Sequence, residues 1–141
     1  MKTLNIGIDI DGTLTGAYDW LPMANHYFKK SIREEDVIEY DIHKVLAISR
    51  DEYEVFYSQF DREIHKNAPI RDDVKLVLDN LYLDHRLHYI TARSPLMKNV
   101  TNHWLNKHDL PITSLSLLGS HSKLSRAYEL GCDIFIEDRY E

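Results

Sequence analysis

Residues 4–14 read LNIGIDIDGTL and hold the strongest structural signal in the chain. Residues 4–10 form a short apolar run rich in isoleucine, and an Asp-Gly-Thr turn signal follows, which together predict a buried strand. Asp9 and Asp11 stand at the end of this strand. Unpaired buried carboxylates are strongly disfavoured, so these two side chains either cap the turn or meet a cation or another partner.

Three more strands are predicted further along the chain, and helical patterns lie between them. The strand candidates are residues 86–91, 114–118 and 133–137, and the helix candidates are residues 72–83, 94–107 and 122–130. Strands that alternate with helices indicate right-handed βαβ units. The predicted fold class is therefore α/β, with a Rossmann-like parallel sheet between two layers of helices.

Residues 15–67 interrupt this alternation, because they contain no convincing strand. Ser31 with Glu34, and Ser49 with Glu52, each match a capping box, and the longest helix is expected at residues 50–66. We interpret the segment as a small all-helical insertion above the strand tips, where open α/β sheets bind ligands. The predicted division is a split core at 1–14 and 68–141, with a helical cap at 15–67.

Length, charge and cysteine content limit the function classes. The 141 residues have a formal net charge of −6 and are 43% hydrophobic, which suits one globular domain with a modest insertion. The acidic balance argues against a surface that binds a nucleic-acid polymer. A single cysteine, Cys132, suits a reducing compartment, and neither a signal peptide nor a membrane span is recognisable. A cytoplasmic protein without a membrane partner is expected.

Polar side chains stand at the predicted ends of the other strands as well. Thr91 ends the second strand, Lys123 opens the helix after the third, and Glu137 and Asp138 end the fourth. Each alone has an ordinary explanation, such as a hydroxyl bonded to backbone, a solvated helix lysine or a polar strand exit. Their coincidence at successive strand ends favours one site beside Asp9.

Clustered carboxylates repel one another and raise one another's pKa unless a cation lies among them. A hard divalent ion such as Mg²⁺ would resolve the conflict with oxygen ligands and leave positions for water and phosphate. With one ammonium and one hydroxyl nearby, the site suits a phosphoryl group. One aspartate could then act as covalent nucleophile and the other as general acid and base.

The order D-x-D-G-T, strand-end Thr, Lys and acidic pair resembles the haloacid dehalogenase-like (HAD) phosphohydrolase superfamily over nearly the whole chain. The resemblance implies that Asp9 is the nucleophile and that Asp11 is the general acid and base. It further implies that several other residues bind the substrate phosphate or the metal ion. Phosphate would be held by Thr91, the amide of Ala92 and Lys123, and Mg²⁺ by Asp9, the main-chain carbonyl of Asp11, Asp138 and Glu137.

Within the superfamily, the helical insertion and the T-A-R and I-E-D-R segments are similar to the 5′(3′)-deoxyribonucleotidase-like group and its bacterial relatives. Two departures stand out. Glu137 replaces the more usual aspartate, so its longer side chain binds the metal directly or through water. Relatives usually continue for another strand and helix beyond the acidic pair, so the end at Glu141 indicates a truncated or partly observed chain and leaves completion of the sheet open.

The cap contributes nine of the fifteen aromatic residues, and their roles are open between core packing and substrate contact. Tyr53, Phe56, Tyr57 and Phe60 recur at helical spacing, which favours the core. Tyr18 and Trp20 follow the first motif outside a clear helix and are candidates to line the substrate cleft, where nucleobases stack well on aromatic rings.

Arg93 is predicted either to pair with the substrate phosphate, to pair with a cap acid such as Asp19, or to be a structural arginine. The eight histidines form no convincing metal set, and we expect most of them to be structural.

The expected function is a Mg²⁺-dependent phosphomonoesterase that acts through an aspartyl-phosphate on a small phosphate ester such as a (deoxy)nucleoside monophosphate. The alternative is a non-catalytic protein that binds a phosphorylated ligand, or regulates, on the same fold. Dehalogenation fits poorly, because it needs neither Asp11 nor an acidic metal cluster. A response-regulator receiver fits poorly as well, because its acceptor aspartate lies on a later strand. The sequence predicts no oligomeric state.

Overall fold

The computed structural model of the chain describes residues 2–39, 41–120 and 122–138. Its centre is a four-stranded sheet in which every neighbouring pair is parallel and the strand order is β3-β2-β1-β4. The strands are β1 (Asn5–Ile8), β2 (Arg86–Thr91), β3 (Ser114–Leu117) and β4 (Ile134–Ile136). All four strands lie within the predicted ranges, and the predicted parallel α/β sheet is confirmed.

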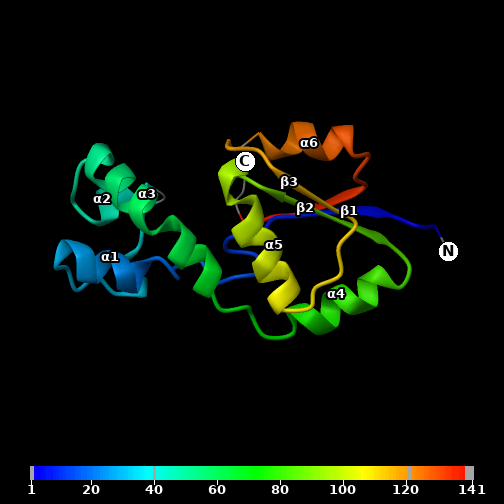
Figure 1. Cartoon of the computed structure of the whole chain (residues 1–141), viewed down its shortest axis with the longest axis horizontal. Helices are drawn as coiled ribbons and strands as arrows, with labels where there is room; N and C mark the ends of the chain where they lie inside the picture. The colour runs from blue at the N-terminus through cyan, green and yellow to red at the C-terminus, as the bar shows by residue number, and fades with distance from the viewer. Residues whose placement is uncertain (1, 40, 121, 139–141) are drawn as a thin grey trace.

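Helices cover both faces of this sheet. Figure 1 shows α4 and α5 below the strands and α6 above them, so the core has three layers. The helices are α4 (Val74–Tyr82), α5 (Lys98–Lys107) and α6 (Lys123–Glu129). The predicted helix at 94–107 is divided, because a 3₁₀ turn, η2 (Pro95–Met97), precedes α5. The Ser94 hydroxyl caps that turn by accepting from the Leu96 amide at 3.2 Å.

A group of helices leaves the core after β1 and lies to one side of it (Figure 1). It consists of α1 (Leu21–Phe28), η1 (Glu34–Asp36), α2 (Ile42–Val45) and α3 (Arg50–Asn67). The capping box at the start of α3 is confirmed: Ser49 Oγ accepts from the Glu52 amide at 3.1 Å, and Glu52 Oε1 accepts from the Ser49 amide at 3.2 Å. The predicted helical insertion after the first strand is therefore present.

The capping box predicted at Ser31 is wrong. The short η1 helix begins at Glu34, and its N-cap is Arg33, whose amide and side chain both donate to Asp36. The amide side chain of Asn25 binds both backbone polar groups of Ile32, at 2.8 and 3.1 Å. These hydrogen bonds hold the backbone beside Ser31 in a loop, which sequence spacing alone does not reveal.

The described residues form two separate hydrophobic clusters. One lies between the sheet and α4 and α5, and it includes Ile8, Tyr89 and Trp104. The other lies inside the helical insertion around Ala24, Leu46 and Phe56. Separate cores support the expected split into a core and a cap, whose boundaries at 14 and 67 stay a prediction. Tyr40, one of the nine cap aromatics, lies outside the described residues.

Two adjacent connections join the cap to the core. An isolated antiparallel bridge pairs Thr15 with Ile70, and the Arg71 amide donates to Leu14 O at 2.9 Å. Trp104 of α5 is fully buried and donates its indole N–H to Ala68 O at 2.8 Å. These bonds hold the C-terminal end of α3 close to the strand tips. Among the described residues, no helix combines the length and apolar character needed to cross a membrane.

Candidate active site

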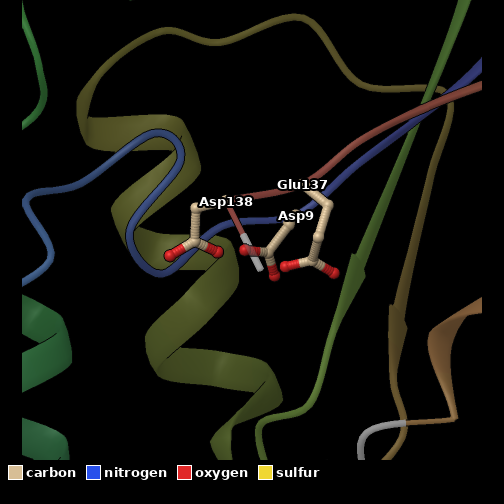
Figure 2. Close-up of side chains that lie close together, drawn as sticks. All are labelled: Asp9, Glu137 and Asp138. Atoms are coloured by element: carbon tan, nitrogen blue, oxygen red, sulfur yellow. The ribbon is translucent and has the colours of Figure 1, made fainter. Parts of the chain in front are cut away.

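Three carboxylates meet where β1 and β4 end. Asp9 follows β1 directly, Glu137 and Asp138 follow β4, and the Asp9 amide donates to Ile136 O at 2.9 Å, which aligns the two strand ends. One oxygen of each carboxylate lies within 4.8 Å of the others. Figure 2 shows the three side chains close together. We call Asp9, Glu137 and Asp138 the acidic cluster.

Lys123 contributes a positive charge to the acidic cluster. Its Nζ lies 2.6 Å from Glu137 Oε2 and 3.2 Å from Asp9 Oδ1, and the residue is 5% exposed. Burial alone would lower the pKa of Lys123, but the pairing with Glu137 and Asp9 outweighs it and raises that pKa. Lys123 therefore remains an ammonium ion at the start of α6, as its position after the third strand predicted.

One ammonium does not balance three carboxylates. Burial raises the pKa of Asp9 to about 8 against the opposing effect of Lys123, and the charge of Glu137 adds to the rise. Burial also raises the pKa of Asp138, whereas Lys123 outweighs burial and lowers the pKa of Glu137. A site that needs further positive charge and offers only hard oxygen donors fits a divalent cation such as Mg²⁺.

The turn after β1 brings its backbone against the acidic cluster. Gly12 has a φ of +81°, a left-handed conformation that favours glycine, and a β-carbon there would collide with the Asp138 carboxylate. The Thr13 hydroxyl donates to Asp9 Oδ2 at 3.1 Å. The Asp-Gly-Thr sequence therefore serves the site through its backbone shape and one hydroxyl as well as through its carboxylates.

Asp11 is held by a buried arginine. Arg93 donates from Nη2 to Asp11 Oδ1 at 2.7 Å and from Nε to Asp11 Oδ2 at 3.0 Å. Its third nitrogen, Nη1, donates to Thr101 Oγ1 of α5 at 3.0 Å. Desolvation by itself would raise the pKa of Asp11, but Arg93 outweighs it and holds that pKa below its usual value. The partner of Arg93 is thus Asp11 rather than the cap acid Asp19.

A histidine and a tyrosine of α3, neither predicted to be functional, approach Asp11 from the cap. His65 is 6% exposed, and its Nδ1 lies 3.6 Å from Asp11 Oδ1. Its Nε2 lies 2.6 Å from the Tyr57 hydroxyl. Burial, with the nearby charge of Arg93, lowers the pKa of His65 to about 4. The one sequence signal is its place at the end of the predicted helix 50–66, where the chain re-enters the core.

These groups line one cavity of about 410 Å³ between the cap and the strand tips. Nine residues predicted to belong to the site border it: Asp9, Asp11, Trp20, Thr91, Ala92, Arg93, Lys123, Glu137 and Asp138. Thr91 is buried, and its Oγ1 accepts from the Arg93 amide at 3.2 Å. Tyr18 does not line the cavity, so its contact with a substrate stays a prediction.

The cap side of the cavity is largely aromatic and aliphatic. It includes Trp20, Ile42, Tyr53, Tyr57 and Ile64. Of the four aromatics at helical spacing, Phe56 is fully buried and Phe60 packs beside it. Tyr53 and Tyr57 reach the cavity, and Tyr53 also packs against the Phe56 cluster. A wall of this kind suits a flat, partly apolar group, whereas the opposite end suits phosphate.

The sequence model of one protein family matches residues 2–141, and the family is described as 5′ nucleotidase, deoxy (pyrimidine), cytosolic type C protein. A nucleotidase of Clostridium acetobutylicum is 43% identical over 141 residues, which cover 100% of this chain and 73% of that protein. Both matches extend over the strand ends that carry the acidic cluster.

Solved structures share the fold at low sequence identity. A HAD-superfamily hydrolase of Geobacter sulfurreducens superposes with a TM-score of 0.58 at 13% identity. The superposition covers 98% of this chain and 81% of the hydrolase chain. YfnB of Bacillus subtilis, solved with magnesium bound, gives a TM-score of 0.54 at 11% identity over 99% of this chain and 75% of its own. The chain therefore belongs to the family described as 5′ nucleotidase, deoxy (pyrimidine), cytosolic type C protein, and it is an enzyme of the phosphatase class with a HAD-type fold.

Proposed function

We propose that this chain is a Mg²⁺-dependent phosphomonoesterase that forms an aspartyl-phosphate on Asp9 and acts on a small phosphate ester, with a (deoxy)nucleoside monophosphate as the favoured substrate. One observation carries the proposal: the acidic cluster with Lys123 shares a single cavity with Asp11 and Thr91. This combination provides a nucleophile, a second carboxylate, a metal site and phosphate-binding groups in one place.

Asp9, Asp138 and the main-chain carbonyl of Asp11 would hold Mg²⁺, with Glu137 as a further ligand, directly or through water. The donor chemistry supports this assignment, since crowded hard oxygen donors attract such a cation. The magnesium-bound neighbour of the same fold also supports it. When bound, Mg²⁺ would neutralise charge on the transferring phosphoryl group.

The chain's own groups then account for each bond change. An Asp9 oxygen attacks phosphorus, and the ester P–O bond breaks with its electron pair on the leaving oxygen. The ammonium of Lys123, the Thr91 hydroxyl and the Ala92 amide stabilise the charge on the non-bridging oxygens. Water then attacks the aspartyl-phosphate, which releases inorganic phosphate and restores the Asp9 carboxylate.

Asp11 handles the protons in both steps. In its acid form it donates a proton to the leaving oxygen, and in its base form it takes a proton from the attacking water. Its side chain lines the cavity beside Asp9 and keeps 46% of its surface exposed, so substrate and water can both reach it. Arg93 binds the carboxylate form and so favours the base role.

The size and walls of the cavity support a nucleotide. A volume of about 410 Å³ lies in the range of small-molecule sites. Trp20 and Tyr53 bring aromatic rings to the cap wall of the cavity, and stacking of a base on an aromatic side chain contributes about 1–3 kcal/mol. The family and the Clostridium acetobutylicum relative are both described as nucleotidases.

The test is phosphate release from a panel of nucleoside monophosphates, deoxynucleotides, sugar phosphates and other small phosphoesters, each with Mg²⁺ and with EDTA. We expect Mg²⁺-dependent turnover that Asp9→Asn abolishes, with Asp72→Asn, at an exposed position before α4, as the matched control. Turnover that survives Asp9→Asn would rule out the assigned nucleophile. Binding of phosphate esters without any release would instead identify a non-catalytic phospho-ligand protein.

A further inference from the structure

The cap helix α3 brings a hydrogen-bonded pair, Tyr57 and His65, to the one catalytic carboxylate that must change partners during the reaction. Asp11 Oδ1 already accepts from Arg93 and lies 3.6 Å from His65 Nδ1. That separation is longer than a hydrogen bond but short enough to become one with a small movement of either side chain. In many enzymes, catalytic hydrogen bonds are long without substrate and shorten once it binds.

The Asp11 carboxylate and the Tyr57 hydroxyl together favour a hydrogen on Nδ1 of His65, because the neutral ring with its hydrogen on Nε2 would turn the Nδ1 lone pair toward the carboxylate. When Tyr57 donates to Nε2 across 2.6 Å, the ring hydrogen lies on Nδ1, toward the carboxylate. When the ring is doubly protonated, Nε2 donates to Tyr57, and Nδ1 again carries a hydrogen. In each of these two forms an Nδ1–H faces the Asp11 carboxylate, whether the imidazole is neutral or charged.

Asp11 thus has donors on two sides that belong to different parts of the fold. Arg93 follows β2 and is fixed to Thr101 of α5, and both residues are buried in the core. His65 and Tyr57 lie eight residues apart on α3. The end of α3 is held by the bond from Trp104 to Ala68, only three residues beyond His65. The position of the imidazole is therefore set by the packing of the cap against the core.

We propose that His65, oriented by Tyr57, is a positioning residue that holds Asp11 for proton transfer to the leaving oxygen, so that α3 takes part in the chemical step and not only in substrate recognition. This inference rests on the proposed role of Asp11. When the ester P–O bond breaks, Asp11 must point its protonated oxygen at the leaving oxygen and transfer that proton to it. A second donor on the cap side keeps the carboxyl group in the cavity when its contacts with Arg93 loosen.

The test compares two leaving groups. The first substrate is an alkyl phosphate, namely the nucleotide that is hydrolysed fastest in the panel, and its basic alkoxide needs an acid to protonate it as it leaves. The second substrate, p-nitrophenyl phosphate, releases a stable phenolate without an acid. Because kcat/KM reports the steps up to release of the leaving group, a misplaced Asp11 lowers kcat/KM for the alkyl phosphate selectively. A change that damages folding or general substrate binding lowers both values alike.

We expect His65→Gln to lower kcat/KM for the alkyl phosphate by about tenfold and for p-nitrophenyl phosphate by less than about threefold, since a poorly placed acid loses part of its effect. His65→Asn keeps a donor near the place of Nδ1 and should recover most of the loss. Tyr57→Phe should reproduce a smaller selective loss. His26→Gln and Tyr27→Phe, both at exposed cap positions, are the matched controls and should change neither value.

Asp11→Asn distinguishes a failure of the positioning role of His65 from a failure of the proposed function. If the wild type hydrolyses both substrates, Asp11→Asn shows the selective loss and His65→Gln does not, the positioning role is wrong while the proposed function stands. If His65→Gln lowers kcat/KM equally on both substrates and His65→Asn does not restore it, the positioning role of His65 is also wrong. Such a result would point to substrate contact or folding. If Asp9→Asn remains active, the proposed function itself fails.

Discussion

The ammonium of Lys123 lies 3.2 Å from the carboxylate of Asp9, although 114 positions separate the two residues in the chain. Lys123 also contacts Glu137, so one buried cation lies between acids from two different strand ends. This contact joins the first and last parts of the described chain at the site. It implies that the same side chain contributes to both the stability and the proposed catalysis.

Replacement of Lys123 by methionine should affect both properties. The apolar side chain leaves the buried Asp9 and the half-buried Glu137 without their cation, which should destabilise the protein by about 3 kcal/mol in EDTA. It should also lower kcat by about hundredfold through the loss of charge beside the transferring phosphate. Denaturant unfolding and phosphate release measure the two effects. An unchanged unfolding midpoint would contradict the ion pairs seen here.

Addition of Mg²⁺ should stabilise the folded chain. A ligand at one hundred times its dissociation constant contributes about 2.7 kcal/mol. The rise in Tm should therefore continue with concentration, and Asp138→Asn should weaken it strongly. Glu129→Gln, on the exposed face of α6, is the control and should leave the Mg²⁺ response intact. Equal Mg²⁺ responses in the two variants would place the cation elsewhere.

Substitution of Gly12 and of Gly131 by alanine distinguishes the cost of backbone strain from the effect of a collision with the acidic cluster. Gly12 and Gly131 both have positive φ, +81° and +66°, but only at Gly12 would a β-carbon strike the Asp138 carboxylate. Each substitution should cost about 1 kcal/mol of strain. Gly12→Ala should in addition reduce Mg²⁺ affinity and turnover, as measured by Mg²⁺ titration of Tm and by phosphate release. Gly131→Ala with the same functional loss would exclude the steric explanation.

The buried imidazole of His65 should make stability depend on pH. Burial lowers its pKa from 6.5 to about 4 in the folded chain. The unfolded chain therefore binds the proton more tightly, and stability falls as the pH falls from about 6.5 toward 4. Between pH 7 and 5 this amounts to about 2 kcal/mol. His65→Gln should show a correspondingly weaker decline in denaturant unfolding in EDTA, while His26→Gln should behave as the wild type.

The amino-acid sequence alone determined the core fold and the location of the candidate site. Short apolar runs that alternate with helical patterns identify the four strands, and the first and fourth end in carboxylates, because buried strands exclude carboxylates except at their tips. In a parallel sheet these tips share one edge, so Asp9, Thr91, Glu137 and Asp138 could be grouped without coordinates. The Ser49 capping box likewise located the start of α3, since that signal is local.

Tertiary structure decided which side chains become partners across the site. Arg93 binds Asp11 across 82 positions, and His65 reaches the same carboxylate, because α3 packs against α5 and Trp104 holds its end. The Ser31 cap was mispredicted because the side chain of Asn25, seven residues before Ile32, binds the backbone next to Ser31. Strand tips follow from local hydrophobic patterning, whereas the Arg93–Asp11 pair depends on how core elements pack and the His65–Asp11 contact on how the cap packs against the core, and local spacing encodes neither.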